Sequence, residues 1–139
     1  MDDDELTFRL GEILGRIPGW MWDPNADAIP EGSVPIFYGR ILDEPDRAVG
    51  VRVYGTEDRL TESLSERRAQ IRFRGARGDA RGANKLAAPA FTLLQGLSRV
   101  GGISDIRRLS MAPLGADNNG REERTDNYII TLDNTEAST

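Results

Sequence analysis

Apolar residues at helical spacing mark the start of the chain. In residues 4–17 they fall at i, i+4, i+7, i+8 and i+11, on one face of an α-helix. Asp3 or Asp4 can cap its first turn, and Pro18-Gly19 ends it. Gly11 and Gly15 each cost roughly 1 kcal/mol relative to alanine, so packing must hold this helix in place. The apolar stripe is Leu6, Leu10, Ile13, Leu14 and Ile17.

Residues 18–35 are rich in proline and predict a loop that contains Trp20 and Trp22. Buried aromatic side chains contribute most of their stabilisation through the area they cover. We therefore expect one or both tryptophans to fold back onto the core. The alternative is an exposed contact with a partner.

Alternation of apolar and polar positions predicts strands at 36–42, 48–54 and 67–74. In the second of these, three valines alternate with Gly50, Arg52 and Tyr54. In the third, Ala69, Ile71 and Phe73 lie on one face and arginines dominate the other.

A second apolar stripe predicts a helix over 80–99, which Pro89 should kink or divide. Two more strands follow at 106–111 and 128–132. They are separated by residues 113–126, a stretch that we expect to be a long polar loop. Residues 134–139 form a tail that we expect to be frayed.

This order predicts one α+β domain over residues 1–139. We expect a two-layer architecture of order α-β-β-β-α-β-β, in which two main helices cover one face of an antiparallel or mixed sheet of about five strands. The uncovered face would then be rich in arginine. Solvation is the ordinary fate of such charges, and a subunit interface or channel wall is the functional alternative. The arginines in question are Arg52, Arg68, Arg72, Arg74 and Arg107.

Composition removes several chemistries. The 139 residues include no cysteine and no histidine, which excludes disulfides, thiolate catalysis, serine–histidine triads and HExxH metal sites. The formal net charge of −5 argues against sequence-independent nucleic-acid binding. No apolar run approaches a membrane span and no signal peptide is evident, so we expect a soluble protein made in the cytoplasm.

Three segments resemble ligand-binding motifs only superficially. Asp23-Pro-Asn25-Ala-Asp27 copies the first ligands of an EF-hand loop but lacks its glycine and its last glutamate. The acids of 43–46 could bind Mg²⁺, although a turn that ends a strand is simpler. Residues 75–85 lack the spacing of a phosphate loop and predict a flexible connection. We therefore expect no catalytic residue, no metal and no cofactor.

Two segments resemble parts of one viral protein family. They are residues 39–55, which end in Tyr54-Gly55, and residues 114–128, which end in Asn127-Tyr128. Between them lie a strand, Gln70–Gly75, and the helix rich in alanine and leucine. In that order these pieces are similar to the tail terminators, often labelled minor capsid proteins, of long-tailed bacteriophages.

The resemblance implies a structural virion protein of the tail and neck, assembled in the host cytoplasm. It implies a homo-oligomeric ring, a hexamer in this family, that caps the tail tube, ends its polymerisation and provides the surface for head joining. The implied partners are the major tail tube protein and the head–tail connector, and the genome would pass through the ring.

The residues themselves suggest which surfaces would serve such an assembly. An acidic patch on one subunit could pair with the arginine face of the next, because heterologous contacts can close into a ring. The loop 113–126 could contact the tail tube. The candidate interface residues are Asp43, Glu44, Asp46, Arg52, Arg72, Arg74, Asp117, Asn119 and Arg121.

Two other functions fit the same residues. A head-completion or stopper protein would act on the portal side of the neck and would not end tail growth. A binding domain unrelated to phages would bind a small ligand or a protein.

Overall fold

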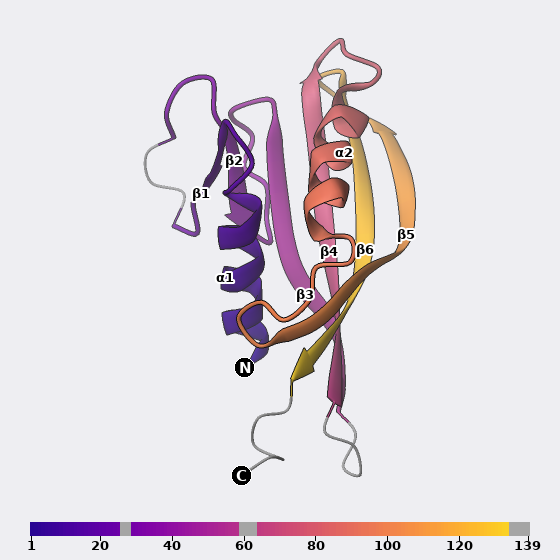
Figure 1. Cartoon of the computed structure of the whole chain (residues 1–139). Helices are drawn as coiled ribbons and strands as arrows, with labels where there is room; N and C mark the ends of the chain where they lie inside the picture. The colour runs from indigo at the N-terminus through magenta and orange to yellow at the C-terminus, as the bar shows by residue number, and fades with distance from the viewer. Residues whose placement is uncertain (26–28, 59–63, 134–139) are drawn as a thin grey trace.

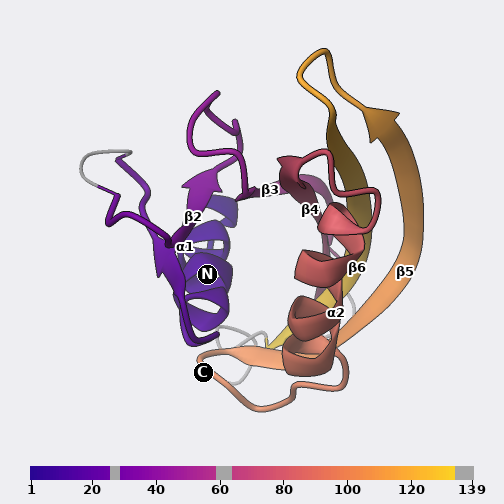
Figure 2. The ribbon, with the colours of Figure 1, turned by 90° about the horizontal axis from the view of Figure 1, so that it is seen from above.

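The computed structural model describes residues 1–25, 29–58 and 64–133. In this part of the chain, two helices lie on one face of a six-stranded mixed sheet that curves around them (Figure 1, Figure 2). The helices are α1 (Asp3–Leu14) and α2 (Gly82–Leu94). The strands are β1 (Trp20–Trp22), β2 (Val34–Tyr38), β3 (Ala48–Asp58), β4 (Leu64–Arg77), β5 (Ile103–Ala116) and β6 (Arg121–Asp133). The predicted α+β class and element order are confirmed, with six strands in place of about five.

The strands lie side by side in the order β1-β2-β3-β4-β6-β5. β1, β2 and β3 pair in parallel, and the remaining neighbours pair antiparallel. The additional strand, β1, lies in the segment that was predicted to be all loop. It has only three residues, too few for alternation to reveal a strand.

α1 is shorter than the predicted helix 4–17, because the residues that cap its two ends differ from the predicted ones. Asp2 is the N-cap, where we expected Asp3 or Asp4, and it forms a capping box with Glu5. The Glu5 N–H donates to Asp2 Oδ1 at 2.7 Å, and the Asp2 N–H donates to Glu5 Oε2 at 3.3 Å. Gly15 ends the helix before Pro18 is reached. The predicted stripe is buried in the core at Leu6, Leu10, Ile13 and Leu14, and Ile17 packs against it.

Gly11 creates the space in which Trp22 packs on α1. A Cβ atom at position 11 would overlap the ring of Trp22, so only glycine fits beneath this side chain. Trp22 and Trp20 are both partly buried against the core, as we expected. The glycine in this helix therefore serves packing.

Gly11→Ala should lower the free energy of unfolding by about 1–2 kcal/mol. Overpacking a fitted site costs about 1–3 kcal/mol, and the gain in helix propensity offsets roughly 1 kcal/mol of it. Urea unfolding measures the difference. The matched control is Gly15→Ala, whose Cβ would find no heavy atom nearer than 3.4 Å and which should be neutral or stabilising. Equal stability of both variants would contradict the packing role of Gly11.

α2 runs through Pro89 as one helix, so of the two effects predicted for this proline, a kink or a division, the division is wrong. The proline removes a single backbone donor, and packing compensates: Leu86, Ala87 and Ala90 are all buried on the sheet. The helix ends at Leu94 and not near residue 99, because Gln95 adopts an extended conformation and Gly96 has a φ of 77°.

The predicted long loop 113–126 is also wrong. β5 continues to Ala116 and β6 begins at Arg121, so the connection is a tight hairpin. The sequence hid these strands because residues 121–126 are polar on both faces, while residues 113–116 include a proline and a glycine. Glu123 and Asp126 find charged partners on neighbouring strands. Alternation of apolar residues, on which the prediction depended, is absent here.

The alternating strands of the centre of the sheet are confirmed. Val49, Val51, Ala69, Ile71 and Phe73 are buried beneath the helices. β2 begins and ends earlier than the predicted strand 36–42, because the chain turns at Gly39, whose φ is 74°. Neither helix of the described residues has the length and apolar character needed to cross a membrane.

Candidate functional site: an arginine hollow on the open sheet face

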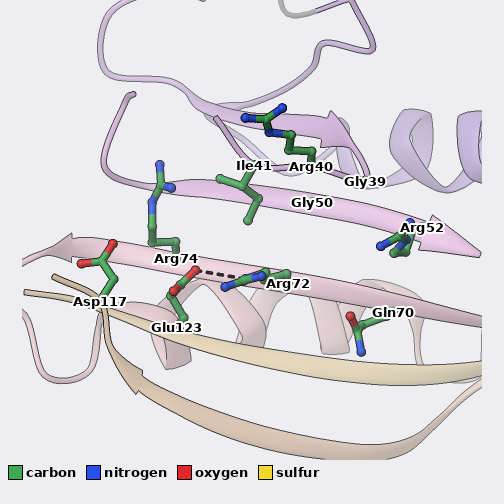
Figure 3. A pocket seen from close by; sticks show the side chains of 10 residues that line it. All are labelled: Gly39, Arg40, Ile41, Gly50, Arg52, Gln70, Arg72, Arg74, Asp117 and Glu123. Carbon is green, nitrogen blue, oxygen red and sulfur yellow. Dashed lines mark hydrogen bonds and ion pairs between the residues drawn. The ribbon is translucent and has the colours of Figure 1, made fainter. Parts of the chain in front are cut away.

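A hollow of about 480 Å³ lies on the sheet face that the helices leave uncovered (Figure 3). Its guanidinium groups come from three places: the segment after β2, the strand β3 and the strand β4. We call it the arginine hollow. It is lined by Gly39, Arg40, Ile41, Gly50, Arg52, Gln70, Arg72, Arg74, Asp117 and Glu123.

The local sequence builds this hollow through strand alternation and one close crossing. Because Val49 and Val51 face the core, their neighbours Gly50 and Arg52 must face the open side. The segment after β2 crosses directly over Gly50, where a Cβ atom would lie 2.5 Å from the carbonyl oxygen of Gly39. Gly50 therefore allows residues 39–41 to form one wall of the hollow.

The hollow carries net positive charge in a chain whose net charge is −5. Four guanidiniums face two carboxylates. Arg72 donates to Glu123 Oε1 at 3.0 Å, but its side chain stays 47% exposed. Arg40 and Arg52 are exposed and form no ion pair with another described residue. These two guanidiniums are available to an external anionic group.

Arg74 has a structural role at the end of the hollow. Its Nε donates to the carbonyl oxygen of Asp46 at 2.8 Å. Its Nη2 donates to the carbonyl oxygens of Leu42 and Pro45, each at 2.7 Å, and of Asp43 at 3.2 Å. Burial lowers the pKa of this guanidinium, and the nearby charge of Arg121 lowers it further. Arg74 thus fixes the backbone of the turn at 42–46.

Arg121 binds the same turn from the β5–β6 hairpin. Its side chain is only 3% exposed and reaches Asp117 Oδ2 at 2.8 Å, Asp43 Oδ1 at 2.9 Å and Asp46 Oδ1 at 3.3 Å. Arg77 adds a bond of 3.0 Å to the same oxygen of Asp46. We call Arg121 and its three carboxylates the arginine clamp. It ties the turn after β2 to the tip of the hairpin.

Two carboxyls of the clamp have lowered pKa values. The hydrogen bond from Arg77 lowers the pKa of Asp46. The backbone N–H of Arg121, together with its guanidinium, lowers the pKa of Asp117. Since both folded values lie below the unfolded value of about 3.8, the stabilisation is present above that pH and is lost as the pH falls through the folded values.

We therefore expect stability to decline as the pH drops below about 4, and Asp117→Asn to flatten that decline. Urea unfolding between pH 7 and pH 2 measures both slopes. Asp105→Asn, at an exposed surface pair, is the matched control and should leave the slope unchanged. An unaltered slope in Asp117→Asn would show that the clamp does not govern acid sensitivity.

The structure divides the nine predicted interface residues into three groups. Four of them line the arginine hollow: Arg52, Arg72, Arg74 and Asp117. Three more belong to the clamp, of which Asp117 is also a member: Asp43, Asp46 and Arg121. Glu44 and Asn119 are exposed at the two turns. Two of the three acids that we expected to meet a neighbour's arginines are therefore bound to arginines of their own chain.

Sequence reasoning missed Arg40, Gln70 and Glu123 as members of the hollow. Gln70 could have been found, because it alternates with Arg72 on β4. Glu123 was missed because residues 113–126 were predicted to be a loop, so the residue could not be assigned to a face of the sheet. Arg40 is placed by the crossing of the segment after β2, and no strand pattern signals that crossing.

The glycine-rich segment before α2 serves close packing. The backbones of Gly75 and Gly82 approach so closely that a Cβ at position 75 would lie 2.5 Å from Gly82 Cα. Asp79 lies at the start of the helix, where it accepts from the Arg81 N–H at 3.0 Å and from Lys85 Nζ at 2.7 Å. A side chain of the protein thus lies where a phosphate loop would hold its anion.

No group of three or more acids within residues 1–25, 29–58 and 64–133 is arranged to hold a metal ion. The EF-hand-like segment at 23–27 falls partly outside these ranges.

Comparison with known proteins identifies the family of this chain. Residues 16–134 match the family described as "Bacteriophage tail terminator protein". None of the curated proteins matches the chain in sequence. One similar solved structure is a chain of the "Virion of native gene transfer agent (GTA) particle", with a TM-score of 0.54 and 11% identity. That likeness covers 94% of this chain and 92% of the other, and at this identity it concerns the fold alone. The family match extends over most of the sequence, and this chain belongs to the bacteriophage tail terminator family.

Proposed function

We propose that this protein forms a ring on the last turn of the tail tube, ends tube polymerisation and presents the surface to which the head connector binds. Membership of the tail terminator family supports a structural role in the phage tail. The observation that carries the structural part of the proposal is the arginine hollow, a net positive and uncovered region on an acidic chain. Its expected partners are a second copy, the tail tube protein or the connector protein.

The hollow suits an acidic protein surface. Arginine binds carboxylates through paired N–H groups, and its weak hydration favours interfaces. Arg40 and Arg52 would make the intermolecular contacts, because Arg72 is bound to Glu123 and Arg74 to backbone carbonyls. This assignment revises the earlier pairing with Asp43 and Asp46, which the clamp already uses.

The hairpin tip at Asp117–Gly120 remains a candidate contact with the tube. It takes the place of the loop that we had expected there. Deleting it would remove Asp117 from the clamp, so Asn119→Arg is the sharper change. Asn119 is exposed, and only its backbone N–H is used, in a bond of 2.9 Å to Asp117 Oδ1. The variant should fold normally and cap tails poorly if the tip touches the tube.

The test of the hollow uses a phage that lacks this gene and is complemented with variants. Reversing both free charges in Arg40→Glu/Arg52→Glu should cost several kcal/mol at an interface, which weakens binding about 100-fold or more. Electron microscopy should then show overlong tails without heads. Arg16→Glu, at an exposed position on the turn after α1, is the matched control and should give normal particles.

Two results would count against the proposal. Normal tails with a folded double variant would remove the hollow from the assembly. Tails of normal length beside filled heads, in the phage lacking the gene, would move the protein to the connector side of the neck, as a stopper protein.

A further inference from the structure

The second half of β5 is an exposed strand without charge. Residues 109–116, which we call the β5 ribbon, are all exposed and include no charged side chain. Leu109, Met111 and Leu114 are 54%, 42% and 49% exposed. β5 is the outermost strand of the sheet, and its second half lies away from α1 (Figure 2). Natural edge strands are normally blunted by charges, so an uncharged apolar ribbon indicates a surface that is covered in the assembly.

The ribbon is built to bind through side chains. Pro113 has no N–H to offer another strand, and register shifts between Arg108 and Ser110 and between Pro113 and Gly115 interrupt its ladder. These features oppose simple addition of a strand to this edge. They leave the apolar side chains free to enter a hollow on a partner.

A hollow of matching character lies on the opposite side of the molecule, against α1. It has a volume of about 560 Å³ and is lined by Met1, Asp4, Glu5, Phe8, Arg9 and Glu12. Met1 and Phe8, 42% and 38% exposed, give it apolar walls. The Phe8 ring is held by Trp22 and Tyr38, with centroids 5.5 and 5.8 Å away. We call it the α1 hollow.

The charges of the two surfaces are complementary. Three carboxylates and one guanidinium line the α1 hollow. The strand that carries the ribbon has no acid from Ile106 to Ala116, and Arg107 and Arg108 directly precede the ribbon. The Arg107 side chain is 62% exposed although it bonds Asp105. At the end of the ribbon that carries Arg107 and Arg108, the contact would therefore bring these guanidiniums near the carboxylates of the α1 hollow.

We propose that the β5 ribbon of one subunit docks into the α1 hollow of a second copy of this chain. α1 packs near the β1 end of the sheet, and the β5 ribbon lies on the strand at the other edge (Figure 1, Figure 2). Such a contact joins unlike patches, so it repeats head to tail and closes into a ring when the rotation allows. The inference rests on the proposed ring and names the surfaces that would form it.

Cross-linking tests this contact cleanly because the chain has no cysteine of its own. Met111→Cys places one thiol on the ribbon, and Glu12→Cys places one in the α1 hollow. Both positions are exposed, so the fold should persist, and thermal unfolding checks it. The two proteins are mixed at a total of about 1 mM, where contacts with a Kd near 1 mM are already populated. A short bismaleimide is then added.

The expected result is a covalent dimer in the mixture and none in either protein alone. A chain that carries both cysteines should give a ladder of cross-linked oligomers, and its largest member should be the closed ring. Glu31→Cys, exposed in the turn before β2, should yield no dimer with either variant. Dimers of Met111→Cys with itself would show an isologous contact and overturn the proposal, as would a mixture without dimer.

Failure of this contact is separable from failure of the proposed function. Tail length in the complemented phage reports tail termination whatever surfaces form the ring. Normal capping by Leu109→Asp/Met111→Asp would overturn the ribbon contact and leave tail termination intact.

Discussion

Asp126→Asn is expected to lower the free energy of unfolding by about 3 kcal/mol, the largest effect of any single change considered. Removing one partner of a buried ion pair typically costs about 3–5 kcal/mol. The lower end applies because asparagine keeps the shape of the side chain and because the Arg108 side chain is 30% exposed.

The reason for this cost is the position of Asp126 between two guanidiniums. Its side chain is fully buried. Oδ1 accepts from Arg124 at 2.8 Å, and Oδ2 accepts from Arg108 at 3.4 Å. Arg108 also lies 4.1 Å from the centre of the Phe91 ring, and Arg124 donates to Asn84 at 2.9 Å. This one carboxylate therefore joins β5 and β6 to α2.

Urea unfolding at neutral pH measures the loss. Asp105→Asn provides the matched control on the neighbouring strand β5, because its bond to Arg107 is exposed and worth at most about 1 kcal/mol. A loss in Asp126→Asn no larger than that of the control would mean that the two arginines find solvent when the carboxylate is neutralised.

Arg121→Ala should cost about 2 kcal/mol and loosen the rim of the arginine hollow. Hydrogen bonds to charged groups contribute about 1.5–3 kcal/mol each. The three carboxylates of the clamp lie near the surface, where water can replace the guanidinium. The contributions of the three bonds to the free energy of unfolding therefore do not add in full. Asp43, for example, has a side chain that is 76% exposed.

Arg77→Ala is the matched control for the clamp. It removes another guanidinium from the same oxygen of Asp46, but the Arg77 side chain is 54% exposed. Its loss should stay within about 1 kcal/mol. Arg121→Lys should restore little stability, because a single ammonium cannot replace the fork that reaches three carboxylates. Equal losses in the alanine variants of Arg77 and Arg121 would contradict the clamp.

Only part of the arginine hollow could be predicted from the sequence. Arg52 and Arg72 were placed on the open face because their neighbours alternate into the core, and this placement is confirmed. Arg74 shares that register, yet its role differs from the prediction, since it binds backbone carbonyls of its own chain. Whether an arginine on an open face stays free depends on which loop folds over it.

The acidic turn at 43–46 shows the same limit. Its composition favours a turn, and the chain does turn there. The sequence could not reveal that Arg121, 78 positions away from Asp43, would bind it. Contacts of such separation depend on the order of strands in the sheet, which brings the β5–β6 hairpin beside the turn after β2.

By itself the sequence determined the features that depend on local periodicity. These are α1, the central strands β3 and β4 with their buried and open faces, and the two-layer α+β class, because a stripe or an alternation is visible within a few residues. The order of the resembling segments also indicated the tail terminator family. Only the tertiary structure decided that residues 113–116 and 121–126 are strand, that α2 runs unbroken past Pro89, and that two acids of the 43–46 turn are bound by Arg121. In each case the deciding interactions join residues distant in the chain, across the sheet or through packing on it, and such interactions leave no periodic signal in the sequence.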